Sequence, residues 1–191
     1  GNGNARYVAE ATSHEAGHTF GLNHQAVWSG GVKTDEYNPG SGDWAPIMGV
    51  GYYANRTTWH QGTSSLSPSH IQDDLAILSG ASNGFGYRAD DFGSTVATAS
   101  TLVSSGSSVN IAGLISTNSD ADIFEFTTSG GALNLTLGVS AYTNLDSVLE
   151  LLNSAGQSIL SSNPAASFGA SLATTLAAGT YYVSVHSSGG Y

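Results

Sequence analysis

Three histidines at fixed spacing constrain this chain more than any other feature of its sequence. Residues 14–24 read His-Glu-Ala-Gly-His-Thr-Phe-Gly-Leu-Asn-His. Positions i and i+4 of a helix lie on one face, so His14 and His18 can direct ring nitrogens at a single ion. Gly21 can take the left-handed conformation that ends a helix, which allows His24 to return as a third ligand. The pattern predicts a helix over residues 6–20, a sharp turn and a three-histidine metal site.

The chemistry expected of this site follows from its ligands. Three neutral imidazoles leave the fourth tetrahedral position of Zn²⁺ open for water, as in catalytic zinc sites. Zinc lowers the pKa of such a water toward about 7, and Glu15 is the expected general base for its proton. The alternatives are a surface helix with chance histidines and an inactive relative of an enzyme. His60 and His70 lie outside the pattern and are expected to be solvated or hydrogen-bonded rather than metal ligands.

The spacing of this motif resembles the signature of the metzincin zinc endopeptidases. The resemblance implies a methionine turn beneath the metal, and Met48, the only methionine, stands in Pro-Ile-Met-Gly at residues 46–49. Met48 would then form an apolar floor under the three imidazoles. The alternative is that Met48 packs in the hydrophobic core without a role at the site. Some metzincins place a tyrosine two residues after this methionine, where this chain has Val50. Tyr52 or Tyr53 could stabilise the transition state from a longer turn, or could simply pack as aromatic side chains.

The remainder of the first half is expected to contain one more helix. Ser67 and Pro68 are a good N-cap and first helical residue, and the pattern predicts a helix that ends near Gly80. Its apolar face would be formed by Ile71, Leu75 and Leu78. Residues 25–65 are rich in Gly, Asn, Asp, Trp and Tyr without a sustained period, which predicts long loops.

From about residue 89 the pattern changes to short alternating runs. The alternating apolar positions are Val109 and Ile111, Phe124 and Phe126, Leu133, Leu135 and Leu137, Leu149 and Leu151, and Tyr181, Val183 and Val185. Turn residues at 129–131, 155–156 and 178–179 separate these runs, which predicts an antiparallel β-sandwich. We therefore expect two domains, residues 1–88 and 89–191, joined by a hinge over residues 83–91. The tail follows a strand directly, which suggests that a final strand is missing.

The second half is similar to the bacterial pre-peptidase C-terminal domain over residues 90–191. The motifs that carry this resemblance are, in order, residues 90–95 with 97–99, 120–126, 144–146 and 178–182. The resemblance implies a domain appended to a secreted peptidase, with roles in calcium binding, export or attachment to insoluble substrates. Carboxylates in loops are also the hard oxygen donors that Ca²⁺ prefers. The candidate ligands are Asp90, Asp91, Asp120 and Asp122, the alternative being that they cap turns and strand ends.

Composition excludes several classes of partner. Four basic residues stand against fourteen acidic ones, giving a net charge of −10. Such a chain is not expected to bind nucleic acid or an anionic membrane surface. Cysteine is absent, so any stabilisation beyond ordinary packing is expected from metal ions or from the core itself and not from disulfides. No apolar run is long enough to span a membrane. A charged content of only 9% favours a secreted, extracellular, bacterial protein.

These observations together predict an α+β fold class: the C-terminal part of a metzincin catalytic domain followed by a jelly-roll-like antiparallel β-sandwich. The leading hypothesis for function is a secreted zinc endopeptidase that hydrolyses polypeptides. The alternative is a non-catalytic extracellular module, in which the β-sandwich binds an insoluble polymer or a cell-surface ligand and the first half is a truncated or degenerate remnant. Metzincins have a twisted sheet upstream of the zinc helix, so we expect that further sequence precedes residue 1.

Overall fold

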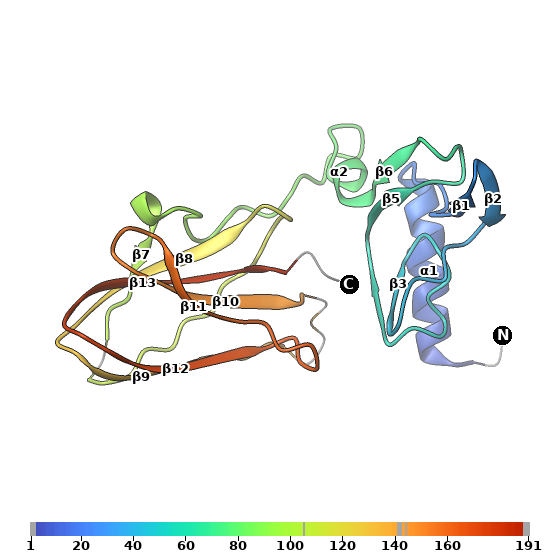
Figure 1. Ribbon diagram of the computed structural model, residues 1–191. Coiled ribbons are helices and arrows are strands. Elements are labelled where there is room, and N and C mark those ends of the chain that lie inside the picture. The colour runs from blue at the N-terminus through green and yellow to red at the C-terminus, as the bar shows by residue number, and fades with distance from the viewer. Residues whose placement is uncertain (1–2, 105, 141–142, 144, 189–191) are drawn as a thin grey trace. The chain divides into compact units, whose positions relative to one another are not determined.

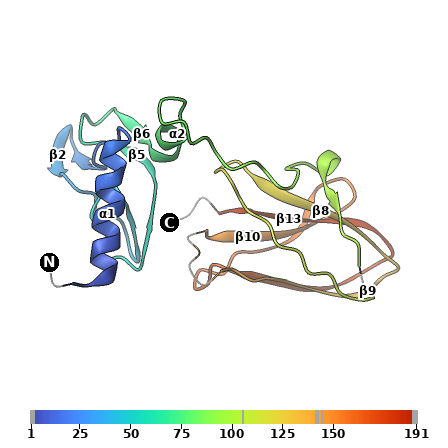
Figure 2. The same ribbon diagram turned by 180° about the vertical axis from the view of Figure 1, so that it is seen from behind.

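A computed structural model describes residues 3–104, 106–140, 143 and 145–188. The described residues divide into two compact units between Tyr87 and Arg88. Figures 1 and 2 show the elements of both units from opposite sides.

One long helix dominates the first unit. Helix α1 spans Ala5–Thr19, one residue earlier at each end than the sequence predicts. The side chain of Asn4 caps its start by accepting hydrogen bonds from the backbone N–H groups of Arg6 and Tyr7, at 3.0 and 3.4 Å. The helix ends before Gly21, which has a φ of +95°. Only glycine adopts this backbone conformation without strain, so the stop is encoded locally.

Three small two-stranded sheets accompany the helix. Strands β1 (Val27–Ser29) and β2 (Val32–Asp35) form an antiparallel hairpin. Strands β3 (Trp44–Pro46) and β4 (Arg56–Thr58) pair in parallel. Strand β5 (Gln61–Thr63) pairs antiparallel with β6 (Ile71–Asp73). The expectation of long loops over residues 25–65 is therefore wrong in part, because five of these strands fall there. Gly30 and Gly31, both with positive φ, form the hairpin turn.

The expected second helix over residues 67–80 is wrong in its first half. Only α2 (Asp74–Leu78) is helical, and the residues before it form β6. Ile71, expected on the buried face, is 57% exposed, whereas Gln72 and Asp74 are almost fully buried. Two hydrogen bonds tie the side chain of Gln72 to the backbone of Asn23, with its Nε2 donating to the carbonyl at 2.8 Å and its Oε1 accepting at 2.9 Å. This buried polar network outweighs the local apolar spacing.

The second unit is built from one larger and one smaller sheet. The five-stranded sheet has the order β11 (Ser158–Ser162), β10 (Ser147–Leu152), β13 (Gly179–Ser187), β8 (Ala121–Thr128) and β7 (Ser100–Thr101). The pairs are antiparallel except β7 with β8. The two-stranded sheet pairs β9 (Gly131–Leu137) with β12 (Ala170–Leu176). A short 3₁₀ helix, η1, covers Val96–Thr98.

Side chains from both sheets share one apolar core. Its buried members are Phe124, Leu149, Leu151, Ala170, Leu172 and Val183. Leu133, Leu135 and Leu137 of β9 pack against them, as their period of two predicts. Val109 and Ile111 do not belong to a strand and are 43% and 45% exposed, so that part of the strand prediction is wrong.

The expected α+β fold class is wrong for the chain as a whole. Strands make up 37% and helices 13%, and α1 is the only helix of substantial length among the described residues. The first unit has small separate sheets, and the second has a sheet of five strands beside a sheet of two rather than a jelly-roll-like sandwich. The main cause is that residues expected to form loops and a second helix instead form short strands.

Candidate metal centre

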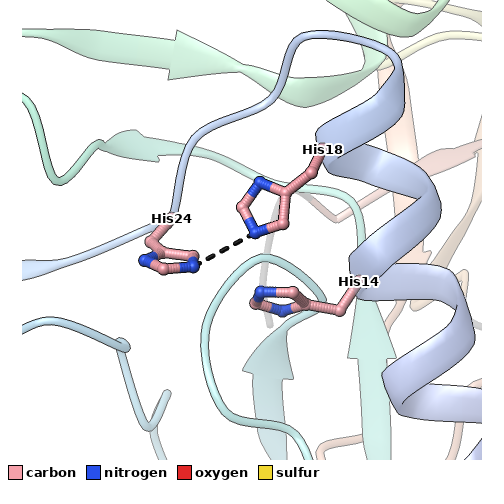
Figure 3. Close-up of side chains that lie close together, drawn as sticks. All are labelled: His14, His18 and His24. Carbon is pink, nitrogen blue, oxygen red and sulfur yellow. Dashed lines mark hydrogen bonds between the residues drawn. The ribbon is translucent and has the colours of Figure 1, made fainter.

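Helix α1 and the turn after it bring three histidines together. His14 and His18 lie one turn apart on α1, and the chain reverses through Gly21 so that His24 returns toward them (Figure 3). The backbone N–H of Leu22 still donates to the carbonyl of Gly17 at 3.1 Å, which ties the turn to the helix end. One ring nitrogen from each histidine lies within 4.8 Å of the other two. The structure thus gathers the predicted ligand set.

Hydrogen bonds of the outer ring nitrogens fix the tautomer of each histidine. The Nδ1 atoms of His14 and His18 donate to the carbonyl oxygens of Ile47 and Leu22, both at 2.8 Å. The Nδ1 atom of His24 donates to Oε1 of Glu36 at 2.6 Å. Carbonyl and carboxylate oxygens only accept hydrogen bonds, so the proton of each neutral imidazole is on Nδ1 and its Nε2 has a free lone pair.

The inner nitrogens lie close enough to share a cation. The Nε2 atoms of His18 and His24 are 3.1 Å apart, a distance that a proton shared between them or a metal ion bound by both can hold. A tetrahedral ion with nitrogen ligands at about 2.0–2.1 Å holds them about 3.3 Å apart. Burial lowers the pKa of His14, which favours the neutral form that binds metal. The donor set therefore fits a zinc ion with an open coordination position.

Met48 is fully buried and lies next to helix α1. A Cβ atom added to Gly17 of α1 would lie 2.5 Å from its sulfur, so the glycine of the motif allows this close approach. The turn is closed by the backbone N–H of Gly49, which donates to the carbonyl of Pro46 at 2.9 Å. Because the carbonyl of Ile47 accepts a hydrogen bond from His14, this turn also orients the His14 ring.

A half-open pocket of about 240 Å³ lies beside the histidines. Glu15, which is exposed on α1, lines it together with His14 and His24. Tyr52 also lines the pocket and packs edge-on against Tyr7, with ring centroids 5.3 Å apart. The predicted base and Tyr52 therefore lie around one cavity.

The other residues considered from sequence lie elsewhere. Tyr53 is 88% exposed and does not line the pocket. The Nδ1 atom of His70 is 2.8 Å from the hydroxyl of Ser64, and the ring of His60 packs on that of Trp44 at 4.8 Å. Burial lowers the pKa of His60. Within the described part of the chain, neither histidine joins the three-histidine cluster.

Sequence reasoning missed two residues of the centre, Glu36 and Tyr37. Glu36 accepts from His24 with one carboxylate oxygen and pairs with Lys33 through the other at 2.5 Å. These two hydrogen bonds, the Lys33 bond first, lower the pKa of Glu36. The ring of Tyr37 lies 4.3 Å from that of His24. The sequence feature that could have indicated these two residues is the Gly-Gly turn before them. It forms a hairpin that returns the chain toward His24.

Loss of the Glu36 carboxylate is expected to weaken zinc binding. Glu36→Ala removes the acceptor that orients His24, and loss of such an outer partner typically costs about 10- to 100-fold in metal affinity. Competition titration against a chromophoric chelator measures the change. Asp35→Asn is the matched control, since Asp35 is exposed and does not join the metal cluster. Equal zinc affinity in Glu36→Ala and the unaltered chain would show that Glu36 does not support the ligand.

A second group of carboxylates gathers in the other unit. Oxygen atoms of Asp90, Asp91 and Asp122 lie within 4.8 Å of one another. Asp122 is only 3% exposed, and its Oδ1 has no hydrogen-bond partner among the described residues. Burial, and then the nearby charges of Asp91, Asp120 and Asp90, raises the pKa of Asp122 to about 7. The charges recorded near this carboxylate are all acidic, so within the described residues no positive charge stabilises its ionised form.

Asp120, the fourth candidate, does not join this cluster of the described residues. Its carboxylate accepts hydrogen bonds from the backbone N–H of Ser116 at 2.5 Å and from the hydroxyl of Ser94 at 3.4 Å. Asp120 therefore fits the alternative of a side chain that caps a turn at the start of β8.

Comparison of the chain with family models, characterised proteins and solved structures finds no match. The two family resemblances therefore stay predictions from the motifs. In the part of the chain that the structure describes, no helix is long and apolar enough to cross a membrane.

Proposed function

We propose that this chain is a secreted, bacterial, zinc-dependent endopeptidase of the metzincin type that hydrolyses polypeptides. One observation supports this proposal most strongly. Three imidazoles, each with its proton directed outward, turn their inner nitrogens toward one point beside a pocket that Glu15 lines. A closed structural site would use a fourth protein ligand, whereas three ligands next to a pocket are typical of catalytic zinc.

The residues of the site have separate roles in this proposal. His14, His18 and His24 would hold the ion, and their outer hydrogen bonds keep the rings in place. When bound, zinc polarises a substrate carbonyl and lowers the pKa of a water molecule toward about 7. Met48 supports the helix from below through its contact with Gly17.

Glu15 would move the proton. It follows His14 directly on α1 and lines the same pocket, so it can accept a proton from the attacking water and pass it to the leaving amine nitrogen. The water oxygen bonds to the carbonyl carbon as Glu15 takes its proton, and the carbon–nitrogen bond breaks afterwards, as Glu15 passes that proton to the leaving nitrogen. Tyr52 is proposed to donate a hydrogen bond to the carbonyl oxygen as negative charge develops there. Tyr37 lines the same pocket and is a second candidate for this role.

Cleavage of an unstructured polypeptide by the zinc-loaded chain tests this proposal, with Glu15→Gln and His18→Ala as comparison variants. Cleavage that depends on both side chains supports the peptidase. A chain that retains zinc but cleaves nothing contradicts it and favours the alternative of a non-catalytic extracellular module.

For the second unit we propose a calcium ion held by Asp90, Asp91 and Asp122. The buried, unpartnered oxygen of Asp122 supports this proposal, because a calcium ion would supply the missing charge and bind hard oxygen donors. Attachment of this unit to an insoluble polymer or a cell-surface ligand is part of the same proposal and rests on the sequence resemblance alone.

Calcium is expected to raise the melting temperature of the unaltered chain but not of Asp122→Asn. A ligand present at about 100 times its Kd stabilises the folded state by about 2.7 kcal/mol, which corresponds to a rise in melting temperature of roughly 10–20 °C in a unit of this size. Asparagine keeps the shape of the side chain, so the variant is expected to fold. Calorimetry with Ca²⁺, and with Mg²⁺ as the control ion, measures the shift. An equal calcium shift in both proteins would contradict this ligand assignment.

A further inference from the structure

The pocket beside the histidines holds a carboxylate that the proposed hydrolysis does not use. Glu10 lies four residues before His14 on α1, on the same face of the helix, and lines the pocket. The cavity of about 240 Å³ is smaller than the pockets of roughly 300–1,000 Å³ that enclose whole small-molecule ligands. It therefore suits a single side chain of a longer substrate.

Neighbouring residues hold the Glu10 carboxylate in place. Its Oε1 accepts a hydrogen bond from the hydroxyl of Thr57 at 2.8 Å. A Cβ atom added to Gly51, a buried residue of the pocket wall, would lie 2.9 Å from Oε2. Any larger residue at position 51 would crowd the carboxylate, so the glycine leaves this end of the pocket open.

The charged side chains that line the pocket are acidic. Glu10 and Glu15 both line it, and the lining described by the structure includes no lysine or arginine. An apolar substrate side chain would displace water from the Glu10 carboxylate, which would keep the Thr57 hydroxyl as its hydrogen-bond donor. Burying the charged carboxylate in this way would disfavour binding. An ammonium or guanidinium group would instead form a charge-assisted hydrogen bond with it.

We propose that Glu10 makes this pocket selective for lysine or arginine in the substrate residue beside the cut bond. The inference rests on the proposed peptidase function, since it assigns the pocket to a residue of the polypeptide being cleaved. Thr57 holds the carboxylate, and Gly51 leaves the space for the basic side chain.

Two peptides that differ only in lysine or norleucine at one position test the proposal. Norleucine keeps the four-carbon stem and lacks the ammonium group. The zinc-loaded, unaltered chain is expected to cleave the lysine peptide with a kcat/KM higher by about tenfold or more, the low end of the range for close charge pairs. In Glu10→Gln, which keeps an oxygen for the Thr57 hydroxyl, the preference is expected to disappear. Asp35→Asn removes one negative charge outside the pocket and should retain the preference.

Binding of the same peptides, measured by fluorescence anisotropy, separates this proposal from the peptidase proposal. Cleavage of both peptides at equal rates would overturn the selectivity and leave the peptidase intact. A Glu10-dependent preference for the lysine peptide in binding, without any cleavage, would support the basic subsite and contradict the peptidase. Absence of a lysine preference in both binding and cleavage would overturn the subsite.

Discussion

Replacing Glu15 with glutamine is expected to lower kcat/KM for polypeptide cleavage by a factor of about 10²–10⁴ while zinc content stays unchanged. Glutamine has nearly the shape of glutamate but cannot accept a proton from water at neutral pH. Glu15 is exposed on α1 and forms none of the hydrogen bonds that orient the three histidines, so the metal site should stay intact. Initial rates on a fluorogenic peptide, together with zinc analysis of the same samples, measure both quantities.

Asp35→Asn provides the control for loss of one negative charge in the first unit, and its cleavage rate should match that of the unaltered chain. If Glu15→Gln cleaves as fast as the unaltered chain with the same zinc content, another group serves as the base and the proposed role of Glu15 is wrong.

Replacing His18 with alanine is expected to lower zinc affinity by more than about 100-fold. Loss of a residue that only hydrogen-bonds to a ligand costs up to roughly 100-fold, and this change removes a proposed ligand itself. Two ligands would remain, and the Nε2 of His24 would lose the nitrogen that faces it at 3.1 Å. Cleavage should fall with zinc occupancy. Chelator competition measures the affinity, and circular dichroism confirms that α1 is retained.

His70→Ala is the matched control for this variant. His70 interacts with Ser64 and lies outside the metal cluster that the structure describes, so this change should leave zinc affinity unaltered. Equal zinc affinity in His18→Ala and His70→Ala would rule out His18 as a ligand.

The three-histidine cluster was predictable where its signals are local. The helix period aligns His14 with His18, and the positive φ of Gly21 allows His24 to return. The same reasoning could not find Glu36, because its contact with His24 depends on how the β1–β2 hairpin packs. No periodic pattern in the sequence encodes such a contact.

The second helix shows how long-range contacts override local preference. Ser67 and Pro68 satisfy the rules for a helix start, yet α2 begins only at Asp74. Asp74 is fully buried and accepts hydrogen bonds from Gln25 and from the backbone of His60. Burial raises the pKa of Asp74, while these hydrogen bonds act in the opposite direction. Partners this distant along the chain cannot be deduced from one window of sequence.

In the second unit, alternation predicted β8, β9, β10 and β13, and it missed β11 and also β12, whose Ala170 and Leu172 are buried in the core. Leu149 and Leu151 of β10 are buried as expected, whereas β11, at residues 158–162, is mostly exposed and carries little apolar signal. Three of the four acidic candidates meet in space, and Asp120 does not join them. Residue type identified the candidates, but only the fold could select among them.

The central claim of this account is that His14, His18 and His24 together hold one zinc ion. Elemental analysis of the unaltered chain, loaded with zinc and dialysed against a weak chelator, tests it most directly. We expect about one zinc per chain, because three oriented imidazoles form a single site. A folded chain that retains no zinc under these conditions would contradict both the metal centre and the peptidase built on it.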